Sequence, residues 1–182
     1  VRDKVICYPH NNGHALEVAP LVESCLRTKE EGWKFVRWGL PQDGTIFEPR
    51  QAVLASIAQF EAVRDAVGDE IELTFDVHTR LDLPDALWLC QEVEPLRPYF
   101  IEDPLRSENP DSFKTLRPRT TVPLAAGEQF SSKWEFRQMV EEEWIDYARI
   151  DLCIAGGFTE ARKIAGWCET HFIKVVGHNP LG

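Results

Sequence analysis

The sequence lacks a CxxC pair, a long apolar run and a surplus of basic residues, and each absence excludes a class of protein. Its five cysteines are odd in number and widely spaced, which indicates neither a disulfide framework nor a zinc cluster. No apolar run approaches the roughly 20 residues of a membrane-spanning helix, and the first ten residues lack the apolar core of a signal peptide. Acidic residues outnumber basic ones by 30 to 20, which argues against a nucleic-acid partner. We therefore expect a cytoplasmic protein that binds neither nucleic acid nor a membrane.

What the sequence does have is a regular alternation of short apolar runs and amphipathic stretches. With 182 residues, 43% of them apolar, the chain has the composition of one large globular domain. The apolar runs predict strands at seven places: residues 4–8, 34–40, 71–77, 99–103, 122–128, 147–152 and 173–178. The amphipathic stretches predict helices over residues 17–32, 49–68, 83–96, 109–118, 131–143 and 157–171. This alternation predicts parallel strands that are joined by right-handed helical crossovers.

Such a pattern fits either an open sheet or a closed barrel. The stretch YPHNNGHA, after the first predicted strand, holds a single glycine, so the glycine-rich fingerprint of a nucleotide-binding open sheet is missing. We therefore expect an α/β fold of the (β/α)8 TIM type. That barrel has eight strands and typically takes about 250 residues. Residues 1–182 are thus predicted to form a partial barrel domain with about seven β-α units and without the last strand.

Polar residues recur at the predicted carboxyl ends of the strands, where a barrel of this type carries its chemistry. They are Arg37, Asp76, His78, Glu102, Asp103, Glu128, Asp151 and His178. From Asp76, the successive steps to Glu102, Glu128, Asp151 and His178 are 26, 26, 23 and 27 residues. Each step is one β-α unit, so we expect these side chains at similar depth around one mouth.

Three of these residues are predicted metal ligands. Asp76, Glu102 and Glu128 would repel one another and raise each other's pKa unless a cation neutralised them. Mg²⁺ prefers oxygen ligands in an octahedral arrangement that keeps places for water and substrate. Any one of these carboxylates alone is better explained as a helix cap or a surface ion pair, but three in phase favour Mg²⁺ as the cofactor.

Five segments carry a family resemblance: FDVHTR, YFIEDPLRSEN, VPLAAGEQF, RIDLCIAGGFTEARKIA and VVGHNPLG. In this order they resemble the catalytic barrel of the enolase superfamily, in its mandelate racemase-like branch, and most of all the galactonate dehydratase type of sugar-acid dehydratases. The resemblance implies that Asp76, Glu102 and Glu128 bind Mg²⁺ and that Asp151 and His178 form an Asp-His dyad. It also implies that His78 acts as an acid.

The implied activity is that of a hydro-lyase acting on a small-molecule sugar acid. The enzyme would remove the C2 proton of an aldonate, D-galactonate in the first place, stabilise the enediolate, and expel the β-hydroxyl to give a 2-keto-3-deoxy acid. His178 suits the base because its ordinary pKa is near neutrality, and Asp151 would fix its tautomer. Either His78 or His178 would protonate the leaving hydroxyl. The alternatives are a dehydratase for mannonate or gluconate and a non-catalytic member that binds metal or sugar acid.

One departure from the family's pattern narrows the activity. The racemase and lactonizing branches carry a Lys-x-Lys pair at the second strand, where this chain has Arg37, Trp38 and Gly39. Arginine is almost always protonated, so two-base racemisation is disfavoured. Arg37 is predicted to bind substrate, or to act as a base in an unusual environment. His10 also lies near the predicted mouth, although the polarity of an exposed loop explains it equally well.

The resemblance carries two expectations about the complete protein. Relatives place an N-terminal capping domain over the barrel mouth, and this domain selects the substrate. No such segment precedes Val1, so we expect these residues to be a piece of a longer protein. The complete protein is expected to be a homo-oligomer.

Overall fold

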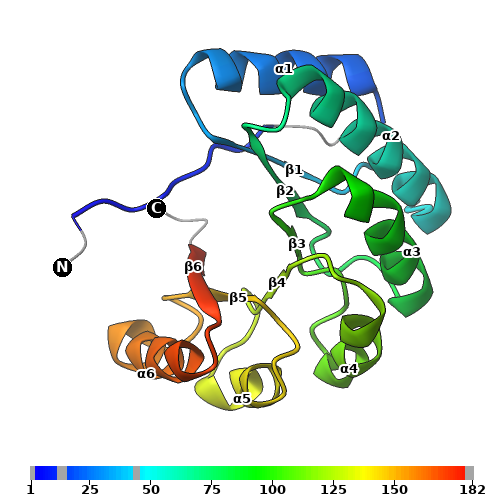
Figure 1. Cartoon of the computed structure of the whole chain (residues 1–182). Coiled ribbons are helices and arrows are strands. Elements are labelled where there is room, and N and C mark those ends of the chain that lie inside the picture. The colour runs from blue at the N-terminus through cyan, green and yellow to red at the C-terminus, as the bar shows by residue number, and fades with distance from the viewer. Residues whose placement is uncertain (1–2, 12–15, 43–45, 179–182) are drawn as a thin grey trace.

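The computed structural model describes residues 3–11, 16–42 and 46–178, and it shows a curled, half-closed barrel (Figure 1). Neighbouring strands are all parallel, and they follow one another in chain order from β1 to β6. Within the described residues the strands are β1 (Phe35–Gly39), β2 (Glu72–Asp76), β3 (Phe100–Glu102), β4 (Leu124–Ala126), β5 (Tyr147–Asp151) and β6 (Lys174–His178). The predicted α/β barrel class is therefore confirmed.

The helices lie on the outer side of the curled sheet (Figure 1). They are α1 (Val18–Glu30), α2 (Pro49–Val67), α3 (Leu83–Val93), α4 (Phe113–Leu116), α5 (Lys133–Glu141) and α6 (Gly157–Thr170). Three short 3-10 turns flank α3 and α4: η1 (Glu94–Leu96), η2 (Pro110–Ser112) and η3 (Arg117–Arg119). Among the described residues, no helix is both long and apolar enough to cross a bilayer.

The strand predicted at residues 4–8 is wrong. No strand is formed between residues 3 and 11, and the side chains of Val5 and Ile6 are 72% and 74% exposed. An apolar, β-branched run is not enough to make a strand, because a strand also needs a ladder and a face to bury. The segment meets the sheet at Asn11, whose N–H donates to the Arg37 carbonyl at 2.6 Å. The described residues thus hold six strands where seven were expected.

The helix predicted at residues 109–118 is also less regular than expected. It is split into η2, the four-residue α4 and η3. Pro110 and Pro118 explain the split, because proline lacks the N–H that continues a helical ladder. Elsewhere the predicted bounds lie within a few residues of the observed ones. The last motif runs into residues 179–182, which lie outside the described part of the chain.

Apolar side chains pack on both faces of the sheet, in two separate clusters. The larger cluster packs the helices against the strands, and in it the rings of Trp38, Phe60 and Phe75 are fully buried. The smaller one holds Phe100 and Tyr147, whose ring centroids are 5.2 Å apart. Side chains alternate along a strand, so Tyr147 lies on the same face of β5 as Arg149 and Asp151.

The strand register brings the predicted site residues to one level. Asp76 pairs with Glu102 across β2 and β3, and Asp151 pairs with His178 across β5 and β6. Glu128 lies two residues beyond β4. The carboxyl ends of the strands therefore form one mouth that carries the charged groups.

Candidate active site

A tight cluster of buried carboxylates lies at the ends of β3 and β4. Glu102, Asp103 and Glu128 each place an oxygen within 4.8 Å of the others, close enough for one metal ion. Asp103 Oδ2 is buried without a hydrogen-bond partner among the described residues, and the buried Glu128 Oε2 accepts no hydrogen bond there but faces the ring of His178 at 3.2 Å. Buried polar atoms are almost always paired, so the unpartnered Asp103 oxygen beside Glu128 marks a place where a cation would fit.

Burial and mutual repulsion raise the proton affinity of this cluster. The pKa of Asp103 lies well above its ordinary value, because the carboxyl is buried and faces Glu102, Glu128 and Asp76. The pKa of Glu128 is raised for the same reasons, burial first and then its acidic neighbours. A bound divalent cation would reverse this preference by stabilising the ionised oxygens.

Asp76 faces the same mouth but is held by Arg37. Arg37 Nη2 lies 2.8 Å from Asp76 Oδ2 and 3.1 Å from Glu102 Oε2, so one guanidinium joins two of the three predicted ligands. Burial alone would raise the pKa of Asp76, but the hydrogen bond from His78 and the charge of Arg37 hold it below its ordinary value. For Arg37, burial acts to lower the pKa, but the charges of Glu102 and Asp76 outweigh burial and raise the pKa above its ordinary value. That charge environment disfavours Arg37 as a base.

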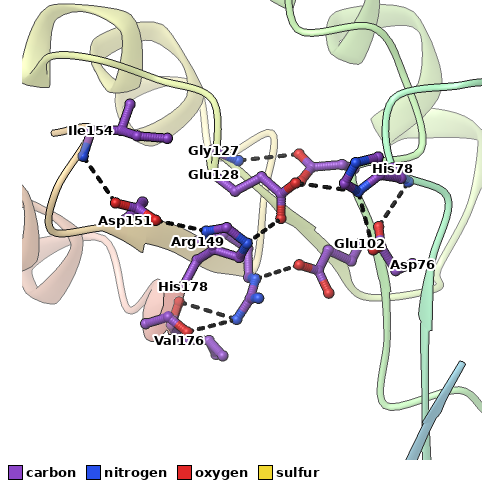
Figure 2. A network of polar contacts seen from close by, with 12 residues as sticks. Asp76, His78, Glu102, Gly127, Glu128, Arg149, Asp151, Ile154, Val176 and His178 are labelled. Atoms are coloured by element: carbon purple, nitrogen blue, oxygen red, sulfur yellow. Dashed lines mark hydrogen bonds and ion pairs between the residues drawn. The ribbon is translucent and has the colours of Figure 1, made fainter. Parts of the chain in front are cut away.

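His78 stands between two of the predicted ligands (Figure 2). Its Nδ1 lies 3.4 Å from Asp76 Oδ2 and 3.4 Å from Glu128 Oε1. The residue has a left-handed backbone with φ of 56°, and its N–H donates to Asp76 Oδ1 at 2.7 Å. The hydrogen bond to Asp76 raises the pKa of His78 in spite of its partial burial. A histidine in this position favours the imidazolium form, which can donate a proton.

Asp151 and His178 form a hydrogen-bonded pair at the ends of β5 and β6. His178 Nδ1 lies 2.9 Å from Asp151 Oδ2, and the other carboxylate oxygen accepts the backbone N–H groups of Cys153 and Ile154. These donors hold the pKa of Asp151 below its ordinary value, against the effect of burial. With Nδ1 donating to Asp151, His178 Nε2 is the basic nitrogen, and it lies 3.2 Å from Glu128 Oε2. The pair therefore points its basic atom at the carboxylate cluster.

Gly127 determines where β4 delivers Glu128. Its φ is 121°, and a Cβ at this position would lie 2.4 Å from Cε1 of Phe136. Its N–H donates to Asp103 Oδ1 at 3.2 Å, which ties the ends of β3 and β4 together. Glycine is required here by both the backbone conformation and the space.

His10 lies beside Arg37 rather than among the carboxylates. His10 Nδ1 is 3.1 Å from Arg37 Nη1, and burial together with the charge of Arg37 lowers the pKa of His10. The predicted site residues thus come together at one mouth, with His10 at its margin.

The sequence interpretation missed the contacts of two residues, Asp103 and Arg149. It places Asp103 at a strand end but does not include it among the predicted metal ligands, whereas the structure groups it with Glu102 and Glu128. Arg149 is 3% exposed and donates from Nε to Glu102 Oε1 at 2.6 Å. The signal for Arg149 was a charged residue inside an otherwise apolar strand, two positions before Asp151.

Comparisons with known proteins agree with this geometry. A D-galactonate dehydratase family member of Enterocloster bolteae is 33% identical, over 98% of this chain and 48% of its own length. A D-mannonate dehydratase of Caulobacter sp. (strain K31) is also 33% identical, over 97% of this chain and 49% of its own length. The chain thus spans about half the length of the curated relatives it matches.

Solved structures show the same fold. An enolase from Pantoea ananatis with bound D-gluconate and Mg has a TM-score of 0.90 at 25% identity, over 98% of this chain and 50% of the other. L-talarate dehydratase from Polaromonas sp. JS666, complexed with Mg and L-glucarate, has a TM-score of 0.86 at 26% identity, over 100% of this chain and 49% of the other.

A match to a family model shows which protein family the chain belongs to. The model described as "Enolase C-terminal domain-like" matches residues 20–182, which is most of the sequence. The order of motifs, the parallel half-barrel and the solved structures all agree with that match. The chain belongs to the enolase superfamily, as part of its C-terminal barrel domain.

Proposed function

We propose that this chain carries the catalytic barrel of a Mg²⁺-dependent sugar-acid dehydratase, a hydro-lyase. The observation that supports it best is the Asp151–His178 pair, whose free ring nitrogen faces Glu128 at 3.2 Å. A positioned base beside a cation-binding cluster is the arrangement that proton removal next to a carboxylate needs. The names of the relatives add that proteins of this kind act on or bind sugar acids.

The residues at the mouth fit Mg²⁺. The proposed ligands are Asp76, Glu102 and Glu128, with Asp103 close enough to take part. Their oxygens are the ligand type that this cation prefers, and the unpartnered Oδ2 of Asp103 leaves a place for it beside Glu128. Bound there, Mg²⁺ would supply positive charge to the oxygens of the substrate carboxylate.

The histidines are proposed to move the protons. His178 takes the C2 proton at Nε2, while Asp151 holds the ring in the correct tautomer and stabilises the imidazolium. His78 then protonates the departing C3 hydroxyl, because its ring lies beside Glu128, across the cluster from His178. Loss of water followed by tautomerisation gives a 2-keto-3-deoxy acid.

The proposed substrate is an aldonate, with D-galactonate first and mannonate or gluconate as alternatives. Arg37 is proposed to contact substrate at the mouth, since its guanidinium already bridges carboxylate oxygens there. The same identity of 33% to relatives named for galactonate and mannonate supports the class of substrate rather than one sugar.

The test is a turnover assay of the complete gene product on a panel of aldonates with Mg²⁺. We expect a 2-keto acid from at least one aldonate, and we expect no product after treatment with a chelator. His178→Asn is expected to lower kcat by at least about 100-fold, the usual effect of losing a general base. The affinity for Mg²⁺, measured by calorimetry, should change little, because His178 is not a proposed ligand.

The matched control is His171→Asn. His171 lies at the end of α6 and contacts Glu143, and it precedes β6, so it lies near the opposite end of that strand from His178. If neither histidine variant changes turnover, His178 is not the base. If the wild-type protein gives no 2-keto acid from any aldonate, the dehydratase proposal is wrong.

A further inference from the structure

Arg149 is a buried charge at the centre of the sheet to which no role has been given so far. It lies on β5 between Tyr147 and Asp151, on the same face of the strand as both, and it is 3% exposed. A charged side chain is very seldom buried this deeply unless it is paired. The partners of its guanidinium therefore indicate what it does.

The two ends of the guanidinium reach in different directions (Figure 2). Nε donates to Glu102 Oε1 at 2.6 Å. Nη1 donates to the backbone carbonyl of Gly177 at 2.9 Å and to that of Val176 at 3.4 Å. Gly177 immediately precedes His178. One rigid, planar group thus joins a proposed metal ligand on β3 to the part of β6 that delivers the proposed base.

Glu102 itself is completely buried and depends on arginines for its partners. Its second oxygen, Oε2, accepts from Arg37 Nε at 3.2 Å and from Arg37 Nη2 at 3.1 Å. Of the two arginines, Arg149 is the one that holds Oε1. Together with Arg37 on Oε2, it therefore fixes the rotation of the carboxylate group about the Cγ–Cδ bond. With both oxygens held, the plane of the Glu102 carboxylate is fixed, and the lone pairs not used by the arginines point in a defined direction.

We infer that Arg149 is a positioning residue that fixes the metal ligand Glu102 and the end of β6 with His178 as one unit. The inference deepens the proposed function, because it assumes that Glu102 binds the cation and that His178 is the base. Arg149 makes no contact with the reacting atoms in this proposal. It acts through the two groups that it holds.

A lysine at this position cannot do the same. The guanidinium is planar and presents donors on two sides, whereas an ammonium is a compact point charge at the end of a flexible stem. Lysine could keep the charge near Glu102 or reach the Gly177 carbonyl, but it would not span both. The two substitutions Arg149→Met and Arg149→Lys therefore separate the loss of charge from the loss of the bridge.

The experiment measures three quantities in the complete gene product. Calorimetry gives the affinity for Mg²⁺ without substrate. Amide hydrogen exchange by mass spectrometry reports the stability of residues 173–178. Turnover of the aldonate found in the panel gives kcat and KM separately. Arg149→Met is expected to weaken Mg²⁺ binding by about 10–100-fold, as removal of a group that orients a ligand usually does, and to speed exchange in β6.

Arg149→Lys is expected to keep more of the Mg²⁺ affinity than Arg149→Met does. It should still speed exchange in β6 and lower kcat by about 10-fold or more, with a smaller effect on KM. Loss of kcat with retained substrate binding would indicate that the base is misplaced, which a general loss of stability does not produce.

Arg64 offers a matched control at the opposite end of the strands. Its guanidinium also holds backbone carbonyls, those of Gly68 and Ile71 at 2.8 Å each and that of Leu96 at 3.0 Å. These carbonyls precede β2 and β3. Arg64→Met and Arg64→Lys should lower the melting temperature and leave Mg²⁺ affinity, β6 exchange and kcat close to those of the wild type.

The outcomes separate the ideas. If the Arg149 variants match the Arg64 variants in all three measurements, Arg149 is structural and the inference is wrong. If Arg149→Met does not fold, Arg149→Lys alone still tests the inference. The inference would be wrong if Arg149→Lys matched the wild type in Mg²⁺ affinity, in β6 exchange and in kcat. If the wild-type protein turns over no aldonate but the variants still separate in Mg²⁺ affinity and exchange, the dehydratase proposal fails and the bridge stands.

Discussion

At the scale of single residues, the site holds buried carboxylates whose negative charge is partly offset by two buried arginines. Asp76, Glu102 and Asp103 are all less than 10% exposed, as are Arg37 and Arg149. Isolated buried charges are costly. Here Arg37 is shared between two carboxylates, and Arg149 between a carboxylate and two backbone carbonyls. Burial and the remaining acidic surplus raise the pKa of Asp103 and Glu128 above their ordinary values. A divalent cation would oppose that rise by stabilising the ionised oxygens.

Asp151→Asn should remove a contribution to stability that depends on pH. In the folded chain, the N–H groups of Ile154 and Cys153 and the ring of His178 outweigh burial and hold the pKa of Asp151 below its ordinary value. Its unfolded pKa is about 3.9. The contribution is therefore complete above about pH 4 and is lost as the pH falls through the lowered folded pKa.

Urea denaturation of the metal-free protein at several pH values measures this effect. Near neutral pH we expect the variant to be about 1 kcal/mol less stable than the wild type, the difference between a charged and a neutral acceptor. The difference should shrink at acid pH. A difference that stays constant from neutral to strongly acid pH would contradict the role given to the ionised carboxylate.

Spacing along the chain predicted most of the site residues but few of their partners. Asp151 and His178 end neighbouring strands, and the family resemblance implied their pairing; in the structure they lie 2.9 Å apart. Arg37 was expected near substrate, but its bridge between Asp76 and Glu102 depends on the curvature of the sheet. Arg149 points into the barrel and pairs across two strands. No sequence period reports such contacts between distant segments.

At the scale of elements, the junctions after the strands do the positioning. The turn after β4 requires Gly127, because its Cβ would meet the ring of Phe136 on α5. The turn after β2 places His78 and Thr79 in left-handed conformations, with φ of 56° and 59°. Two of the proposed site residues, His78 and Glu128, thus lie in turns directly after short strands, and the turn that carries Glu128 packs against α5.

Gly127→Ala is expected to destabilise the protein and disturb Glu128. The new methyl group would lie 2.4 Å from Phe136 Cε1 in a backbone with φ of 121°. Overpacking of this kind typically costs about 1–3 kcal/mol. Thermal unfolding gives the stability, and calorimetry gives the Mg²⁺ affinity, which should fall because Glu128 is a proposed ligand.

Gly166→Ala is the matched control. Gly166 lies inside α6, where a Cβ would have no atom within 4 Å. Alanine favours a helix over glycine by about 1 kcal/mol, so this variant should be slightly more stable and bind Mg²⁺ normally. Equal behaviour of the two alanine variants would show that the turn after β4 tolerates a side chain.

The sequence predicted the elements well where local and long-range preferences agree. Helix α2 begins at Pro49 and ends before Gly68, as expected because proline favours the first turn of a helix and glycine the position just after its end. The run at residues 4–8 has the composition of a strand, but in the described structure no strand pairs with it, and Tyr8 is the residue of the run that packs against the sheet. What was missing there was the long-range pairing of the segment. The predicted helix at 109–118 was broken by prolines that the sequence already shows.

At the scale of the whole molecule, the half-barrel leaves an open side. A cleft of about 1300 Å³ lies along β6 and the N-terminal segment, lined by aromatic side chains such as Tyr8, Phe100 and Tyr147. Val175 on β6 is 45% exposed, and Phe172 just before it is 94% exposed. Strand edges with exposed apolar side chains favour association with other chains.

Residues 1–182 expressed alone are therefore expected to associate. Size-exclusion chromatography with light scattering should show species larger than a monomer, increasingly so at higher concentration. Val175→Lys should reduce the association, because charged side chains on an edge discourage strand pairing. A soluble, cooperatively melting and active monomer of residues 1–182 would contradict this expectation.

The strand order has a consequence for how such a site can change over time. The proposed cation ligands occupy β2 to β4, and the proposed proton-transfer pair occupies β5 and β6. Among the described side chains of the site, these two blocks are joined chiefly by the contacts of Arg149 with Glu102 and of His178 with Glu128. A recombination event between β4 and β5 would exchange the proposed base and keep the proposed cation ligands and the proposed acid His78, provided that these two contacts survive in the hybrid.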